Sequence, residues 1–282
     1  MTEPTTLTDR AALRRNRARA FARDDAALFL HELAADEIQE RLELVNRSFT
    51  APAVISPLPR IWGDVVPGAQ HVDDTDILDL SAGAHDLVIH AMNLHWANDP
   101  VGQLVQCRRA LKPDGLLIAV LLGGQTLAEL RAALAQAESR LTGGLSPRVL
   151  PMAEIRDLGA LLQRAGFALP VADSSLHRVS YRDAFHLMSD LRAMGEGNAL
   201  AARPRRPSPR ALFVEAARVY ADSFQDSENR IPATFETIFL TGWAPDASQP
   251  QALRPGSAQS RLADALNTTE TTVSDPARPR RV

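Results

Sequence analysis

Three aspartates stand in one short stretch of the chain, where they could hold a polar ligand. They are Asp73, Asp74 and Asp76. An ionised carboxylate accepts hydrogen bonds from amines and hydroxyls, so this stretch could form part of a binding site. The alternative is an acidic loop whose side chains are simply solvated.

A second polar group, Asn93, His95 and Trp96, directly follows a compact apolar run. Histidine titrates near neutral pH, so His95 could act as a general base or position an acceptor group, with Asn93 beside it. The alternative is a packed Trp96 and a hydrogen-bonded histidine that together fix the loop.

Other residues of reactive type are explained by packing or by turns. His90 lies inside an apolar run and Cys107 inside a helical pattern, so we expect both in the core. Glu196 and Asn198 belong to a loop that could face a cleft, although a turn at a helix end explains them as well. No His, Asp or Glu cluster has the spacing of a metal site, and no serine, histidine and acid pattern indicates a hydrolase.

The second polar group belongs to the clearest structural pattern in the sequence. Residues 85–92 form an apolar run typical of a buried strand in a parallel sheet. Asn98-Asp99-Pro100 then predicts the start of a helix, and Lys112-Pro113-Asp114-Gly115 predicts its end and a turn. Leu116 to Leu122 is a second buried strand. Together these segments make one βαβ unit, whose carboxyl edge must carry the second group.

The remaining patterns extend this unit in both directions. They predict early short strands at 53–56 and 70–73, late strands at 169–180 and 234–243, and helices at 24–49, 59–66, 126–141, 152–165, 181–194, 208–224 and 262–266. We expect an N-terminal helical segment (1–48), an α/β domain (49–244) and a mostly flexible tail (245–282).

Composition excludes several classes of protein. The 282 residues have a net charge of −3, which gives no general case for nucleic-acid binding. The longest apolar run is too short to cross a bilayer, so we expect no stable membrane insertion. One cysteine rules out an internal disulfide framework. We expect a cytoplasmic protein, because the basic segment Arg10 to Arg23 has acids close by and reads as a surface helix, solvated or touching an acidic partner. A solvated linker is expected at Arg203, Arg205, Arg206 and Arg210, and the alternative is that these arginines bind an acidic partner.

Several motifs together resemble those of class I methyltransferases, which use S-adenosylmethionine (SAM). HDLVIH at 85–90, LHW at 94–96 and LKPDG at 111–115 resemble strand 4, the loop after it and the turn before strand 5 of that class. Narrower motifs downstream resemble the methyltransferase-like arginine hydroxylase family that assists assembly of respiratory complex I: GGQTLAELR, GGLSPR, DLGALLQRAGF, DLRAMGEGNA and RPGSA. The same series is more distantly similar to the carrier-protein methyltransferase of biotin synthesis.

The resemblance implies an α/β, Rossmann-like sheet with SAM at the carboxyl ends of its strands and a lid of added helices. It implies that the cofactor contacts Asp74, Asn93, Trp96 and Ser56, and that Asn93 and His95 serve the reaction. In mitochondrial relatives the reported role is hydroxylation of an arginine in an iron–sulfur subunit of complex I, so a complex I subunit is the implied partner.

The segment that should hold SAM departs from the family pattern. A glycine-rich turn lets the backbone approach the cofactor, but Ala53 to Leu58, which stand at that place, include no glycine and no acid. Pro57 and Pro59 remove two further N–H donors. Three βα units before strand 4 need about 70 residues, judging from the usual size of a βαβ unit, whereas Phe49 to His85 supply 37. We therefore expect a sheet that is shortened in its N-terminal half.

Two functional hypotheses follow from these observations. The first is a SAM-dependent methyltransferase-like protein with weakened or lost cofactor binding, acting in complex I assembly or protein modification. The alternative is a non-catalytic assembly or chaperone module that binds a protein partner. The sequence leaves the methyl acceptor and the oligomeric state open.

Overall fold

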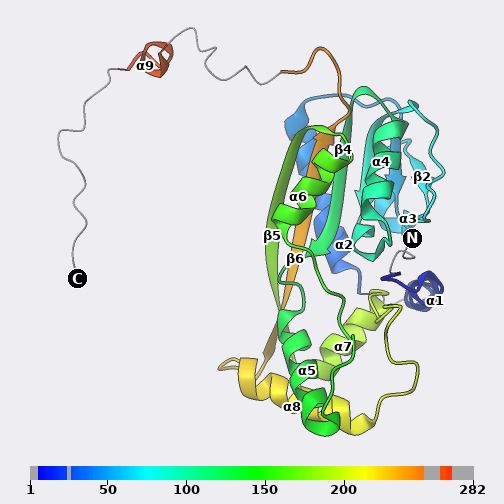
Figure 1. The fold of residues 1–282 in the computed structure, drawn as a ribbon, viewed down its shortest axis with the longest axis vertical. Helices are drawn as coiled ribbons and strands as arrows, with labels where there is room; N and C mark the ends of the chain where they lie inside the picture. Colours follow the sequence, from blue (N-terminus) through cyan, green and yellow to red (C-terminus); the bar gives the residue numbers. More distant parts are fainter. Residues whose placement is uncertain (1–5, 24–26, 251–260, 269–282) are drawn as a thin grey trace, which may run out of the picture. The chain divides into compact units, whose positions relative to one another are not determined.

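The apolar runs of the sequence form one mixed sheet. The computed structural model describes residues 6–23, 27–250 and 261–268, and the chain divides into two units, Met1–Asp246 and Ala247–Val282. In the first unit six strands lie in the order β2-β1-β3-β4-β6-β5 (Figure 1). They are β1 (Pro52–Ile55), β2 (Gln70–Val72), β3 (His85–Ala91), β4 (Leu111–Gly123), β5 (Ala168–Tyr181) and β6 (Ile231–Trp243). The strands from β2 to β4 are parallel, and β6 is antiparallel to both β4 and β5.

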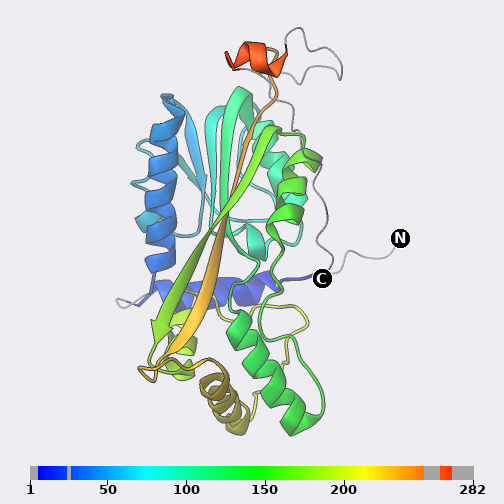
Figure 2. The same ribbon diagram turned by 90° about the vertical axis from the view of Figure 1, so that its left-hand side faces the viewer.

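Helices cover both faces of this sheet. α2 (Phe29–Val45) and α3 (Pro59–Trp62) lie on one face, and α4 (Pro100–Ala110) and α6 (Ile155–Arg164) lie on the other (Figures 1 and 2). Successive residues of β4 enter two different core clusters, because side chains of a strand alternate between the faces of a sheet. Both faces are therefore apolar, as expected of a Rossmann-like sheet.

Three helices extend the fold beyond the carboxyl ends of the parallel strands. They are α5 (Ala128–Thr142), α7 (Ala184–Ala193) and α8 (Arg210–Phe224), and the long strands β5 and β6 reach down to them. α1 (Arg10–Phe21) runs across the molecule between the sheet and these helices (Figure 2). The three helices are the added lid that the resemblance implied. In the second unit the structure describes one short helix, α9 (Leu262–Ala265).

The predicted βαβ unit is present as β3, α4 and β4. One detail differs from the prediction, because the LKPDG turn lies within β4 as an interruption of its pairing. Leu111 pairs with His85 and Leu116 with Leu87, so the four intervening residues bulge out of register. α2 is shorter than the predicted helix at 24–49, since Asn46 adopts a left-handed conformation with φ of 50° and ends it.

The predicted shortage of sheet before β3 is confirmed. Within residues 27–84 the structure describes only two strands, and β2 is three residues long. Most of the predicted tail lies outside the described residues, and the division of the chain at residues 48 and 244 stays a prediction.

Candidate functional site

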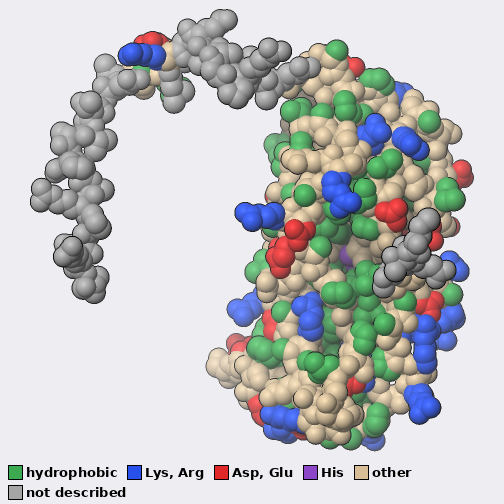
Figure 3. All heavy atoms as spheres, viewed as in Figure 1, with side chains coloured by type: hydrophobic (Ala, Val, Ile, Leu, Met, Phe, Trp, Pro, Cys, Tyr) green, Lys and Arg blue, Asp and Glu red, His purple; other side chains and the backbone are tan. Residues whose placement is uncertain are grey.

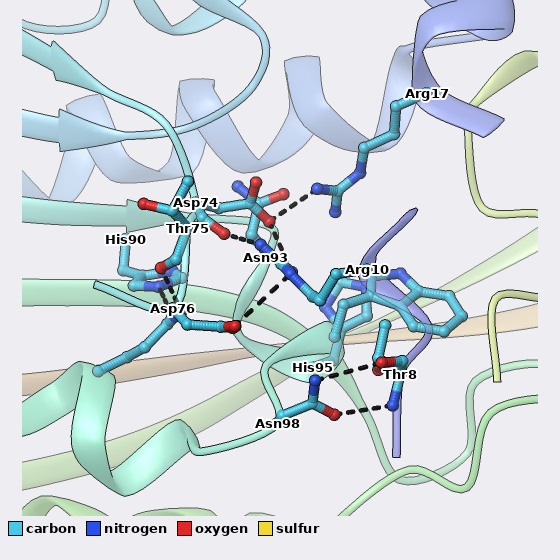
Figure 4. Close-up of polar contacts among 12 residues, drawn as sticks. Thr8, Arg10, Arg17, Asp74, Thr75, Asp76, His90, Asn93, His95 and Asn98 are labelled. Carbon is cyan, nitrogen blue, oxygen red and sulfur yellow. Dashed lines mark hydrogen bonds and ion pairs between the residues drawn. The ribbon is translucent and has the colours of Figure 1, made fainter. Parts of the chain in front are cut away.

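The candidate site lies where the parallel strands end. Ser56 follows β1 and Asp74 follows β2. After β3 come Asn93 and then His95, which lies in the 3-10 turn η1 (Leu94–Trp96). Figure 4 shows Asp74, Asn93 and His95 on one edge of the sheet, facing side chains of α1. The segments predicted to carry the site therefore lie at the same edge of the sheet.

Asp74 is buried, at 8% exposed, and its carboxylate is already paired within the chain. Arg17 Nη1 lies 2.7 Å from Asp74 Oδ2, and Arg10 Nη1 lies 3.3 Å from the same oxygen. Arg10 also donates to the Asp74 backbone carbonyl. The expectation of a solvated acidic loop is wrong for Asp74, although Asp73 and Asp76 are exposed.

Both arginines come from α1, whose basic face was expected to be solvated or to touch a separate partner. Instead Arg17 is 6% exposed, because it lies on the same face of α1 as Leu13 and Ala20, at helical spacing. One nitrogen of its guanidinium, Nη2, is buried without a hydrogen-bond partner among the described residues. Arg17 was not among the predicted site residues, although its spacing among the apolar residues of α1 was a usable signal.

The loop that carries Asp74 is anchored to α4. Gln103 donates to the carbonyl of Thr75 at 3.0 Å and its Oε1 lies 2.7 Å from His90 Nε2. Gln106 donates to the Asp76 carbonyl at 3.0 Å. Burial lowers the pKa of His90 and outweighs the contact with Gln103. His90 is therefore neutral, and its predicted place in the core is confirmed. Its support of the loop through Gln103 was not predicted.

Asn93 closes the turn that follows β3. Its amide nitrogen donates to the Ala91 carbonyl, and the turn is completed by Met92, which has a left-handed φ of 54°. Asn93 is 2% exposed, and its side-chain oxygen is buried without a partner among the described residues. This arrangement favours a turn-forming role.

His95 and Trp96 converge on Glu196, which comes from the loop after α7. Trp96 Nε1 donates to Glu196 Oε2 at 2.7 Å, and His95 Nε2 lies 3.4 Å from the same oxygen. The other ring nitrogen of His95 faces the backbone N–H of Leu122 at 3.4 Å. Burial would raise the pKa of Glu196, but contacts with His95, Arg17 and Trp96 outweigh it and lower the pKa to about 2. Glu196 is thus an ionised residue facing the site, and the engaged ring of His95 favours the packing interpretation over a free base.

Asn198, two residues further, makes the predicted turn. It donates to the Pro147 carbonyl at 3.0 Å and accepts from the backbone N–H of Leu200 at 3.0 Å. Its loop also holds the N-terminal segment, since Thr8 pairs with Leu200. Of the arginines in the expected linker, Arg203 and Arg205 form ion pairs with Asp9, so they hold the N-terminal segment against this part of the chain.

A buried histidine on α2 lies near the same charges and was not anticipated. His31 Nδ1 accepts from Trp62 Nε1 at 3.2 Å. Burial lowers its pKa to about 4; the nearby Glu196 raises the pKa by a smaller amount, and Arg17 lowers it further. His31 is therefore neutral at physiological pH and serves as an acceptor for the indole. Its position in an amphipathic helix carried no signal of this contact.

The residues after β1 do not fit SAM. The Ser56 hydroxyl accepts from the backbone N–H of Leu58 at 3.1 Å, and Leu58 and Trp62 are buried where a glycine turn would leave room for the cofactor. The nearby carboxylate, Asp74, is held by two guanidinium groups, which would also repel the positively charged sulfonium of SAM. Nothing in this set of donors replaces the missing glycine-rich turn.

An apolar pocket of about 250 Å³ opens between this edge of the sheet and the lid helices. Its walls include Leu127, just before α5, Leu130 of α5 and Met188 of α7. Trp96 and Glu196 line it as well. Gly123 permits close packing at the end of β4, because a Cβ there would stand 2.2 Å from Ile238 Cδ1 of β6 and 3.1 Å from the carbonyl oxygen of Ala153, in the segment before α6. On the face drawn in Figure 3, hydrophobic side chains gather near the junction of the sheet and the lid.

The described part of the chain contains neither a metal-binding cluster nor a membrane-spanning helix. Residues 6–23, 27–250 and 261–268 contain no group of three His, Cys, Asp or Glu side chains able to hold a metal ion. Over the same residues, no helix combines the length and the apolar character needed to cross a membrane.

Comparison with known proteins identifies the family. The methyltransferase domain family matches residues 29–119. The mitochondrial arginine-hydroxylase NDUFAF5 of Danio rerio is 34% identical over 222 residues, which is 79% of this chain and 69% of that protein. A malonyl-[acyl-carrier protein] O-methyltransferase of Methylovorus is 32% identical over 293 residues, covering 90% of this chain and 96% of that protein. The structure of a Burkholderia thailandensis 1,6-didemethyltoxoflavin-N1-methyltransferase aligns with a TM-score of 0.43 and 13% identity. The alignment covers 87% of this chain and 92% of that protein's chain.

The lengths of these matches are also informative. Proteins named arginine-hydroxylase NDUFAF5 from human, Dictyostelium discoideum, mouse and rat are matched over 42% to 63% of their own length, so the chain spans less than two thirds of them. The alignment with the Methylovorus protein is longer than the part of this chain that it covers, so that relative has residues that this chain lacks. The chain belongs to the methyltransferase-like family that includes the NDUFAF5 arginine-hydroxylases.

Proposed function

We propose that this chain acts in the assembly of respiratory complex I as a methyltransferase-like protein that does not hold SAM at the usual edge of its sheet. The observation that carries the proposal is the pairing of Asp74 with Arg17 and Arg10 of α1. A carboxylate engaged in this way is not free to accept hydrogen bonds from a nucleoside. Breaking a buried ion pair costs about 3–5 kcal/mol in other proteins.

A protein partner is the proposed ligand of the assembly role, and a complex I subunit is the candidate that the family suggests. The lid supplies a large surface for such a contact, since α5, α7 and α8 project beyond the sheet. The names of the relatives place them in mitochondria. For this chain we propose the cytoplasm, in line with an arginine-rich composition typical of a GC-rich bacterial genome.

An enzymatic role is the second candidate, favoured by one observation. Trp96 and Glu196 line the pocket, and Glu196 in turn contacts His95, the residue that could move a proton. This candidate requires that His95 leave its contacts with Glu196 and Leu122 and act on a bound substrate.

A complementation experiment in a bacterium that carries this chain and complex I separates the two candidates. We expect deletion of the chain to lower the amount of assembled complex I on native gels, and re-expression of wild type and of His95→Gln to restore it. His177→Gln, on β5 away from the site, is the matched control. If deletion leaves complex I unchanged, the assembly role is wrong. If folded His95→Gln fails where His177→Gln succeeds, the enzymatic candidate replaces it.

A further inference from the structure

The pocket between the sheet and the lid is lined mainly by apolar side chains, so it favours an apolar ligand. Leu127, just before α5, and Leu130 and Leu134 of α5 line a volume of about 250 Å³ together with Met188 of α7 and Phe213 of α8. Water in such a space makes few hydrogen bonds, and each buried methylene of a ligand would contribute about 0.8 kcal/mol. Methionine adapts its shape to different apolar ligands, which suits a binding wall.

Three charged side chains line the pocket, and two of them are already engaged by other side chains of the protein. Arg148 lies 2.6 Å from Glu138 Oε1 and also donates to Ser208 at 2.9 Å. The hydrogen bond from Arg148 is the main cause that lowers the pKa of Glu138 to about 2, so this pair is fully ionised. Glu196 is engaged by Trp96 and His95.

The third charged side chain, Arg192, is different. It is exposed, lies in the last turn of α7 and lines the pocket. Its guanidinium forms no hydrogen bond or ion pair with any residue that the structure describes. The pocket therefore combines apolar walls with one guanidinium at its rim that has no partner among the described residues, and this group complements an anionic head group.

We propose that this pocket binds a straight-chain carboxylate of about eight carbons, with the tail between α5 and α7 and the carboxylate at Arg192. The size follows from the volume: about 250 Å³ has room for roughly eight groups that each occupy about 30 Å³, the share of a water molecule in the liquid. A bidentate contact with the guanidinium would fix the head group. The site is independent of the proposed assembly role, and it needs neither Asp74 nor His95.

Three probes that share one chain test the charge argument: octanoate, octanol and octylammonium. We would titrate each into the full chain by calorimetry at about 10 mM ionic strength, where charges are screened only beyond about 30 Å. We expect octanoate to bind with a dissociation constant below about 1 mM, and at least tenfold more tightly than octylammonium. Equal or tighter binding of octylammonium would show that Glu196 sets the head group and would overturn the proposal, as would failure of octanoate to bind.

Two variants test the location. Arg192→Glu should weaken octanoate at least tenfold, whereas Arg164→Glu should leave it unchanged, because Arg164 is likewise exposed in the last turn of a ten-residue helix but lies on α6, away from the pocket. Met188→Trp should fill the pocket and abolish binding of both octanoate and octanol. If Arg192→Glu binds octanoate as wild type does, the carboxylate does not sit at Arg192 and the proposal fails. Because none of these variants touches the contacts of Asp74, complementation of complex I assembly remains a separate readout.

Discussion

Removal of the Arg17 guanidinium should destabilise the protein measurably. In Arg17→Met the apolar stem is kept, but Asp74 loses the partner that lies 2.7 Å away. Both side chains are nearly buried, at 7% and 11% exposed. Loss of one member of a buried pair costs about 3–5 kcal/mol, because the remaining charge is left unpaired. Here Arg10 stays at 3.3 Å, so we expect a smaller loss of about 2–3 kcal/mol.

Urea unfolding followed by circular dichroism measures this loss. With a denaturant slope of about 3 kcal/mol/M, the midpoint should fall by roughly 1 M. Arg14→Met is the matched control, since Arg14 is an exposed arginine of the same helix, and it should change the free energy of unfolding by less than about 0.5 kcal/mol.

A second substitution tests the cause. Asp74→Asn added to Arg17→Met removes the unpaired charge, so the double variant should be more stable than Arg17→Met alone. The reasoning is refuted if Arg17→Met costs no more than Arg14→Met, or if the added Asp74→Asn brings a further loss of similar size.

Three further predictions concern the core around the site. His31 has a folded pKa of about 4 against 6.5 for the free side chain, so it stabilises the fold above pH 6.5; as the pH falls to 4 about 3 kcal/mol of that stability is lost. His31→Gln should flatten the fall in urea midpoint across this range, and an unchanged slope would contradict the assignment. Gly123→Ala should cost about 1–3 kcal/mol, because the new Cβ would stand 2.2 Å from Ile238 Cδ1, whereas Gly144→Ala, which meets nothing within 4 Å, should be nearly neutral by thermal unfolding. Cys107 is buried, which raises its thiol pKa to about 12, so it should react with a disulfide reagent only after urea unfolding; rapid labelling of the native protein would show that α4 opens.

Local patterns were sufficient for the centre of the fold. The apolar run at 85–92 and the turn at 112–115 predicted β3, α4 and β4, because a buried parallel strand and a helix stop each have a short-range signature. The shortage of residues before His85 predicted the reduced sheet, since a βαβ unit has a minimum length. Both inferences depend on residues that lie close together in the chain.

The contacts that decide the chemistry of the site are long-range, and local patterns do not contain them. Arg17 meets Asp74 across 57 residues, and Trp96 meets Glu196 across 100. Whether a basic helix is solvated or buried depends on what the fold places against it. The aspartate alone favoured a solvated loop, and only the docking of α1 shows that it is paired.

Titration of the purified chain with SAM by calorimetry tests the central claim most directly, because the claim is that α1 and the proline-rich turn after β1 take the place of the cofactor. We predict no saturable binding up to about 1 mM SAM for the wild-type protein. Micromolar binding by the wild type that is lost in Asp74→Asn would show that the carboxylate receives the cofactor despite Arg10 and Arg17, and would contradict the account.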